Sequence, residues 1–331
     1  MKKSAVFKPV FLFALFPLFA MSAFFSCTSQ AARTAQAEEY FSIGIAYYEL
    51  GKFNEAEVWF NRARAADKTI VASDYNLGRI AFETKRYADA ARYFEGVLAL
   101  DGDNVMALKA AAYSRIRNGD LEMAEALYDR VLVLVPESAD DGYNYALVLY
   151  GLEKYENCEE VLNKYPFSLE EKPSSILLFA RAQKAQNKVE AVDSYAKWLI
   201  VYTGTANPQG LYEYAQVLEI AGLYARAIEQ IRDATKALTK DTETLSKSKL
   251  LFEEARLLLT VDPENEEGLT AFGSAVDEGF SDTETFEALL LDGRISDARK
   301  DELRRIFESR EIEEEEEVSE ETEENTDGNG Q

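Results

Sequence analysis

The residue types that carry most enzymatic chemistry are scarce in this chain of 331 residues. It has no histidine, which excludes Ser-His-Asp and Cys-His catalysis and every metal site that needs an imidazole ligand. The only cysteines, Cys27 and Cys158, are too few for a four-cysteine zinc site or an iron–sulfur cluster. Asp and Glu are plentiful, but none stands in a motif with acid–base spacing, and no Gly-rich phosphate loop or nucleophile elbow occurs. We therefore expect no catalytic residue, no metal site, no cofactor and no enzyme activity.

The charge of the chain also excludes a class of partner. The formal net charge is −24, whereas a nucleic-acid ligand needs a basic surface. Residues 311–331 contain ten Glu and Asp327 without any Lys or Arg. This composition predicts a solvated, disordered acidic tail, and docking to a basic partner is the alternative for it.

The N-terminus has the pattern of an export signal. Lys2, Lys3 and Lys8 come before an apolar run from Val10 to Phe25. A basic segment followed by a short apolar segment is typical of a secretory signal, which we place at residues 1–26. This run of sixteen residues, broken only by Pro17 and Ser22, would span only about 24 Å as a helix, so a retained membrane anchor is the less favoured alternative.

The end of this signal suggests what becomes of Cys27. Ser26 directly precedes Cys27 where the apolar run closes, which resembles the lipobox of bacterial lipoproteins. The resemblance implies that the Cys27 thiol is acylated and that the mature, membrane-anchored chain starts there. Phe24 and Phe25 replace the usual Leu and small residue, and relaxed lipoboxes of this kind are typical of spirochaetes. The alternative is an ordinary signal cleaved nearby. With Cys27 acylated, residues 27–36 are expected to form a short tether between the lipid and the folded body.

A period of 34 residues runs through the body of the chain. Three columns of small or aromatic residues keep this spacing over four units. They are Gly44, Gly78, Ala112 and Ala146; Ala56, Ala90, Ala124 and Cys158; and Phe60, Phe94, Tyr128 and Leu162. Cys158 stands in a column of alanines, so we expect a small buried hydrophobe there rather than a redox site.

This pattern resembles the tetratricopeptide-repeat (TPR) family. The first unit matches best, with Tyr40, Ile43-Gly44 and Tyr47 on one helix and Ala56 and Phe60 on the next. The resemblance implies an all-α fold of antiparallel helix pairs that stack into a right-handed superhelical solenoid. It covers residues 37–280 as about six to seven units, with a helical cap over 281–310. Gly51, Gly119 and Gly222 are expected to take positive φ in turns, and the turn of the fifth unit is expected to be one residue short.

A second apolar stripe on the first helices could line a groove. In this family those positions face the concave surface, and the candidate partner-binding residues are Phe41, Ile45, Tyr48, Tyr75, Phe82, Lys109, Tyr113, Tyr143, Leu147 and Tyr150. Aromatic side chains at these positions either bind a peptide or ligand, or pack neighbouring helices together. A carboxylate clamp is not expected, because only Lys109 fits it while Glu49 and Glu83 oppose it.

The function that follows is a lipid-anchored scaffold of the cell envelope, exported or periplasmic. Its expected partners are other envelope proteins or peptides, and the membrane itself through the N-terminal lipid. A ligand-handling accessory of a periplasmic substrate-uptake transporter is the alternative, and an enzyme-accessory or cell-wall factor is a third possibility. The oligomeric state, the partner and the membrane leaflet stay open.

Overall fold

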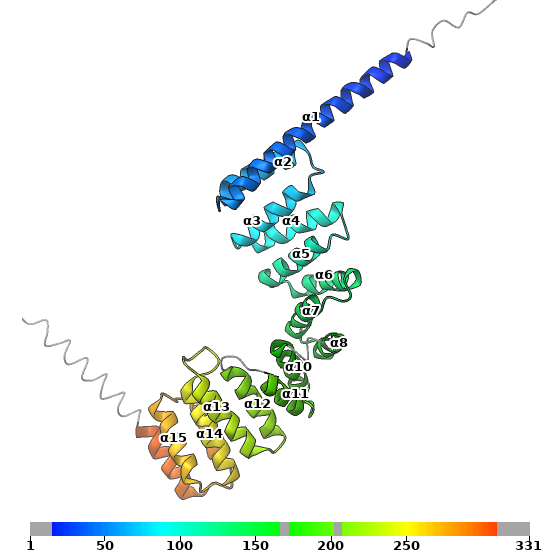
Figure 1. Ribbon diagram of the computed structural model, residues 1–331. Helices are drawn as coiled ribbons and strands as arrows, with labels where there is room; N and C mark the ends of the chain where they lie inside the picture. Colours follow the sequence, from blue (N-terminus) through cyan, green and yellow to red (C-terminus); the bar gives the residue numbers. More distant parts are fainter. Residues whose placement is uncertain (1–14, 166–171, 202–206, 310–331) are drawn as a thin grey trace, which may run out of the picture. The chain divides into compact units, whose positions relative to one another are not determined.

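The computed structural model describes residues 15–165, 172–201 and 207–309, with side chains from residue 30 onward. The described residues form α-helices joined by short turns, without a strand (Figure 1). The chain divides into two compact units, Met1–Tyr165 and Pro166–Gln331, which are described separately. This confirms the all-α fold expected from the repeats.

The first unit consists of consecutive antiparallel helix pairs. The helices are α1 (Leu15–Glu49), α2 (Phe53–Ala66), α3 (Val71–Glu83), α4 (Tyr87–Leu100), α5 (Val105–Asn118), α6 (Leu121–Leu134), α7 (Ala139–Gly151) and α8 (Tyr155–Lys164). A glycine on the first helix lets the aromatic ring of the second helix approach closely. A Cβ added at Gly44 would lie 2.7 Å from the Phe60 ring, and one added at Gly78 would lie 2.7 Å from the Phe94 ring. The small and aromatic columns therefore set the contact between the paired helices.

The turns within the pairs repeat a left-handed backbone conformation. Gly51 and Gly119 have φ of 69° and 87°, as expected from the sequence. Lys85 and Glu153 occupy the same place in the other two pairs, at φ of 61° and 59°. This column continues the 34-residue period through residues that are not glycine, so the turn geometry is set by the hairpin and not by residue type.

The second unit continues the pairs and closes with a helical cap. Its helices are α10 (Pro173–Ala185), α11 (Ala191–Val201), α12 (Pro208–Ile220), α13 (Tyr224–Ala237), α14 (Lys247–Val261), α15 (Glu266–Asp277) and α16 (Thr283–Leu290), followed by a helix over 297–309. Asn187 has φ of 56°, which keeps the period of the left-handed column from the first unit. The residue missing from the fifth unit is therefore lost after Asn187, before α11 begins.

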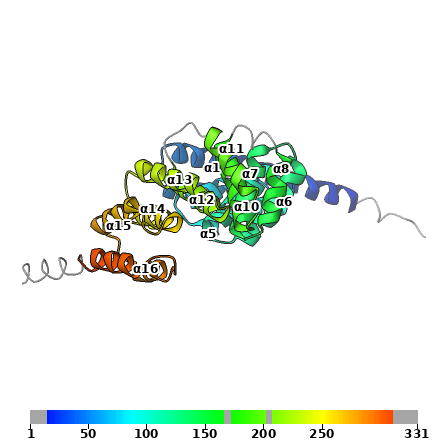
Figure 2. The same cartoon turned by 90° about the horizontal axis from the view of Figure 1, so that it is seen from below.

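Aromatic rings hold the cap in place. Phe286 on α16 stacks on Phe272 of α15 with ring centroids 5.3 Å apart, and on Phe307 at 4.3 Å. Figure 2 shows α16 lying beside α15. Phe252 of α14 stacks on Phe280 at 4.1 Å. These buried rings extend one continuous core from Ile176 to Phe307.

The segment that is expected to form a tether is part of the N-terminal helix. α1 continues through residues 28–36 as helix and projects past the end of α2 (Figure 1). The Thr34 hydroxyl donates a hydrogen bond of 2.7 Å to Asp67, at the end of α2, and Ala37 is fully buried. Among the described residues, no helix is long and apolar enough to cross a membrane. Cys27, the whole predicted signal at 1–26 and the acidic tail at 311–331 lie outside the residues whose side chains are described.

Candidate functional site

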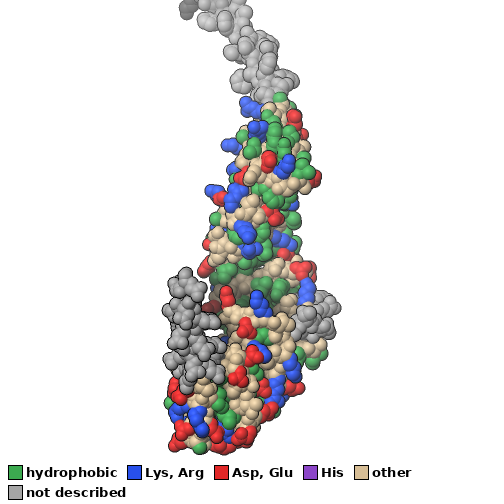
Figure 3. All heavy atoms as spheres, turned by 90° about the vertical axis from the view of Figure 1, so that its left-hand side faces the viewer, with side chains coloured by type: hydrophobic (Ala, Val, Ile, Leu, Met, Phe, Trp, Pro, Cys, Tyr) green, Lys and Arg blue, Asp and Glu red, His purple; other side chains and the backbone are tan. Residues whose placement is uncertain are grey.

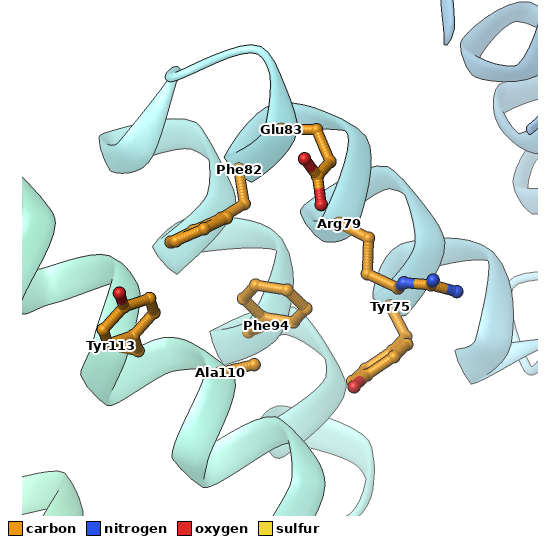
Figure 4. Close-up of a pocket in the computed structure, with 7 residues that line it drawn as sticks. All are labelled: Tyr75, Arg79, Phe82, Glu83, Phe94, Ala110 and Tyr113. Atoms are coloured by element: carbon orange, nitrogen blue, oxygen red, sulfur yellow. The ribbon is translucent and has the colours of Figure 1, made fainter. Parts of the chain in front are cut away.

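A small aromatic pocket lies between two neighbouring repeats of the first unit. Its volume is about 160 Å³, and α3, α4 and α5 supply its walls (Figure 4). The lining residues are Tyr75, Arg79, Phe82, Glu83, Phe94, Ala110 and Tyr113. Three candidates from the predicted stripe, Tyr75, Phe82 and Tyr113, thus come together in one place.

Ring contacts fix the aromatic walls of this pocket. Tyr75 meets the Phe94 ring at 5.3 Å in an edge-on arrangement. Phe82 contacts Tyr113 of the next repeat, also at 5.3 Å. Tyr113 remains 48% exposed, whereas Phe94 is buried. The lining of the pocket therefore combines a buried ring, Phe94, with an exposed one, Tyr113.

The stripe residues also join one repeat to the next. Phe82 of α3 contacts Tyr113 of α5. The guanidinium of Arg79, on α3, lies over the ring of Tyr48 on α1, 4.4 Å from the ring centroid. Arg79 and Tyr113 are 34 residues apart, as are Tyr48 and Phe82. The same pair of positions thus makes the same inter-repeat contact twice, once as a cation–π pair and once between two rings. Packing accounts for much of this stripe.

The remaining predicted groove residues fall into two groups. Phe41, Ile45 and Tyr48 pack against the core of the first two pairs, where Phe41 lies 5.5 Å from Phe60. On α7, Tyr143 is half-buried, Leu147 is 42% exposed, and Tyr150 contacts Tyr155 across the turn at 5.3 Å. None of these lines the pocket between α3 and α5.

Lys109 is neutralised by its neighbour. Its ammonium lies 2.5 Å from the carboxylate of Asp141, a buried residue on α7. A buried carboxylate requires a partner, so this ion pair links α5 to α7 rather than presenting a free cation to a ligand. Arg64 and Asp74 make a similar pair between α2 and α3 at 2.9 Å, while burial raises the pKa of Asp74.

Arg79 and Glu83 were not among the predicted site residues. Both stand one turn apart on α3 at the rim of the pocket, and the Arg79 guanidinium also donates to Asn76 at 3.1 Å. The period offered a signal, because Arg79 falls midway between Ile45 and Tyr113 in one column. A charged residue breaks an apolar pattern, so a search for apolar stripes passes over it.

Two ionisable side chains in the core of the first unit have raised pKa values. Burial raises the pKa of the Cys158 thiol to about 12, so this sulfur is a poor nucleophile inside the helix pair. Burial likewise raises the pKa of Tyr128 to about 12. In the described part of the chain, no cluster of three or more carboxylate or thiol side chains could hold a metal ion. What the pocket can do is accept an apolar side chain.

Comparison with known proteins agrees with this architecture. The family described as "Tetratricopeptide repeat" matches residues 41–105 and 75–142, and the family described as "Anaphase-promoting complex, cyclosome, subunit 3" matches residues 117–197. Residues 41–142 are tetratricopeptide repeats. The pocket lies within these TPRs.

Similar proteins extend the likeness to most of the chain. An uncharacterized lipoprotein of Treponema pallidum is 26% identical over 182 residues, which is 55% of this chain and 91% of the relative. A tetratricopeptide repeat protein from Parabacteroides merdae has a TM-score of 0.52 at 19% identity, over 77% of this chain and 98% of its own. The C-terminal part of a TPR repeat-containing protein from Cytophaga hutchinsonii has a TM-score of 0.60 at 12% identity, over 75% of this chain and 99% of its own. These two structures share the fold.

Proposed function

We propose that this TPR protein is a lipid-anchored scaffold of the cell envelope that binds an extended segment of another protein. The observation that supports binding of such a segment is the aromatic pocket of about 160 Å³ between α3, α4 and α5. Sites for small ligands usually occupy about 300–1,000 Å³, so this pocket suits one apolar side chain rather than a whole ligand. Tyr113, at 48% exposure, would cover that side chain as it enters.

The envelope assignment rests on the N-terminus and on a relative. Ser26-Cys27 closes the apolar run as a lipobox would, and the similar Treponema pallidum protein is described as a lipoprotein. Acylation of Cys27 would anchor the chain, since two or more acyl chains hold a protein stably on a membrane. Mass spectrometry of the mature protein should find Cys27 at the N-terminus with an acyl mass, and another N-terminus without such a mass would contradict the anchor.

Site-specific photo-crosslinking tests the pocket. A benzophenone amino acid placed at Tyr113 should cross-link one defined segment of a partner in intact cells. The matched control is Val58 on α2, which is 51% exposed and lies away from the pocket. The Tyr113 product should weaken when Tyr75 is replaced by Ala in the same chain, because Tyr75 forms another wall.

The identity of the cross-linked protein then separates the candidate functions. Assembly proteins of the envelope would support the scaffold, and the binding protein of an uptake transporter would support the accessory role. Equal cross-linking from Tyr113 and Val58 would contradict the pocket as the binding site.

A further inference from the structure

The start of the folded body lies very close to Cys27. α1 is continuous from Leu15, and the Thr34 hydroxyl is held by Asp67 at 2.7 Å. Asp67 also accepts hydrogen bonds from the backbone and the side chain of Thr69. The bond from Thr34, together with these two from Thr69, lowers the pKa of the Asp67 carboxyl group. This Thr34–Asp67 hydrogen bond, here called the clamp, joins α1 to the turn after α2. Thr34 lies only seven residues beyond Cys27.

The conformation of these seven residues decides how far the body stands from the membrane. As helix they span about 10 Å, whereas a fully extended segment would reach about 25 Å. The Debye length at physiological ionic strength is about 8 Å. As a helix, the spacer holds the end of α2 at about one Debye length from Cys27, whereas a fully extended segment could place it about three Debye lengths away.

The end that faces Cys27 carries exposed basic residues. Arg33 directly precedes Thr34, and Lys68 directly follows Asp67, so the clamp holds both at the same end of the first unit. Both are exposed, and among the described side chains neither has an acidic group within ion-pairing distance. Figure 3 shows that Lys and Arg side chains on the upper part of this unit are interspersed with Asp and Glu. Glu38 and Glu39 lie at least one turn farther along α1.

We propose that Arg33 and Lys68 contact an anionic lipid surface, and that α1 is a short rigid spacer holding the TPRs against it. This rests on the proposed lipid anchor at Cys27. The rest of the mature chain is strongly acidic and is repelled by anionic headgroups, so the basic end orients the molecule. Each Lys or Arg near such a surface raises the binding constant of the protein for the membrane about fivefold.

Energy transfer to the membrane surface measures this orientation. The lipidated protein is reconstituted into phosphatidylcholine vesicles, with or without phosphatidylglycerol, that carry an acceptor dye on the headgroups. Donor dyes are attached to Ala65→Cys or, as a matched control, to Asn54→Cys on the same helix. Both positions are exposed, and they are about 16 Å apart along α2. Cys158 is buried and Cys27 would be acylated, so the introduced cysteine takes the dye.

The expected result is stronger transfer from residue 65 than from residue 54. A Gly-Ser insertion after Ser29 should abolish the difference, because it makes the spacer flexible. Arg33→Gln with Lys68→Gln should lower transfer from residue 65 on vesicles with phosphatidylglycerol to the value on phosphatidylcholine alone. Lys52→Gln, at the other end of α2, should not change it.

The outcomes separate this inference from the anchor. Equal transfer from both positions in the lipidated protein would overturn the rigid spacer. The headgroup contact would be overturned if transfer from residue 65 were the same with and without phosphatidylglycerol. It would also be overturned if the double substitution left that transfer unchanged. A chain that carries no acyl mass and does not enter the vesicles would overturn the lipid anchor and the inference that rests on it, and the mass spectrum identifies this case.

Discussion

Single residues show how the hairpin dictates backbone conformation. Gly51, Lys85, Gly119 and Glu153 all have positive φ at the same place in successive helix pairs. An L-residue with a side chain is strained there, at a cost of about 1–2 kcal/mol. The chain accepts this cost at Lys85 and Glu153 because the surrounding pair fixes the turn.

Lys85→Gly should therefore stabilise the protein. Removing the side chain relieves the left-handed strain, and we expect a gain of about 1 kcal/mol in the free energy of unfolding. Lys52→Gly is the control, because Lys52 lies beside the first turn with φ of −86°. That change should stabilise nothing. Urea unfolding of both variants makes the comparison, and a loss of stability in Lys85→Gly would contradict the strain argument.

Two helical glycines should respond to alanine in opposite directions. A Cβ at Gly78 would lie 2.7 Å from the Phe94 ring, while one at Gly96 meets nothing within 4 Å. Gly78→Ala should lower stability by about 1–3 kcal/mol through overpacking, and Gly96→Ala should raise it by about 0.5–1 kcal/mol through helix propensity. Thermal melting shows whether each substitution lowers or raises the melting temperature. Two shifts in the same direction would show that close packing is not the reason for glycine at position 78.

At the scale of helices, the aromatic stripe has two roles that mutation can separate. Tyr75 contacts Phe94 within its own pair, whereas Tyr113 contacts Phe82 and is 48% exposed. Tyr113 therefore offers more surface to a partner, and Tyr75 contributes more to the fold. Their responses to truncation should differ accordingly.

Tyr113→Ala should weaken binding of the cross-linked partner by about 2 kcal/mol, with a melting temperature close to that of the unmodified protein. Tyr75→Ala combined with Tyr143→Ala should weaken binding too, but with a lower melting temperature because the Tyr75–Phe94 contact is lost. Circular dichroism and partner titration on the same samples provide both quantities. A large fall in melting temperature for Tyr113→Ala, with binding intact, would assign its ring to packing alone.

The helix pairs could be predicted from the sequence because columns of small and aromatic residues repeat every 34 residues. Ala56, Ala90, Ala124 and Cys158 are all fully buried, as their column predicts. The turn at Lys85 could not be predicted from composition, since glycine is the usual marker of positive φ. Arg79 was missed because the inter-repeat contact that it makes with Tyr48 uses a guanidinium where Tyr113 uses a ring. The Lys109–Asp141 pair depends on two helices meeting in space, which spacing along one helix does not reveal.

At the scale of the whole chain, the division into two units predicts separable unfolding. Trp59 lies in the first unit and Trp198, which is 1% exposed, lies in the second. In a Trp59→Phe background, fluorescence reports on the second unit, while far-ultraviolet circular dichroism reports on both. We expect the two urea transitions not to coincide, as for any chain whose parts unfold separately.

Ala90→Phe sharpens this test. Ala90 is fully buried where α3 meets α4, so a ring there should cost about 1–3 kcal/mol, at the upper end of that range. It should move the circular-dichroism transition of the first unit and leave the Trp198 transition in place. Arg92→Ala is the surface control, since Arg92 is exposed. A shift of the Trp198 transition equal to that of the first unit would show one cooperative body.

The buried Cys158 also bears on how the protein matures. Its sulfur is enclosed between α7 and α8 with 0% exposure, and it is a free thiol. The helices around it are held by packing and hydrogen bonds, so they can form equally well in an oxidising or a reducing compartment. With Cys27 acylated, as proposed, the chain has no second thiol to pair with Cys158. Disulfide formation would then play no part in assembly of the folded body, and its rate would depend on helix pairing.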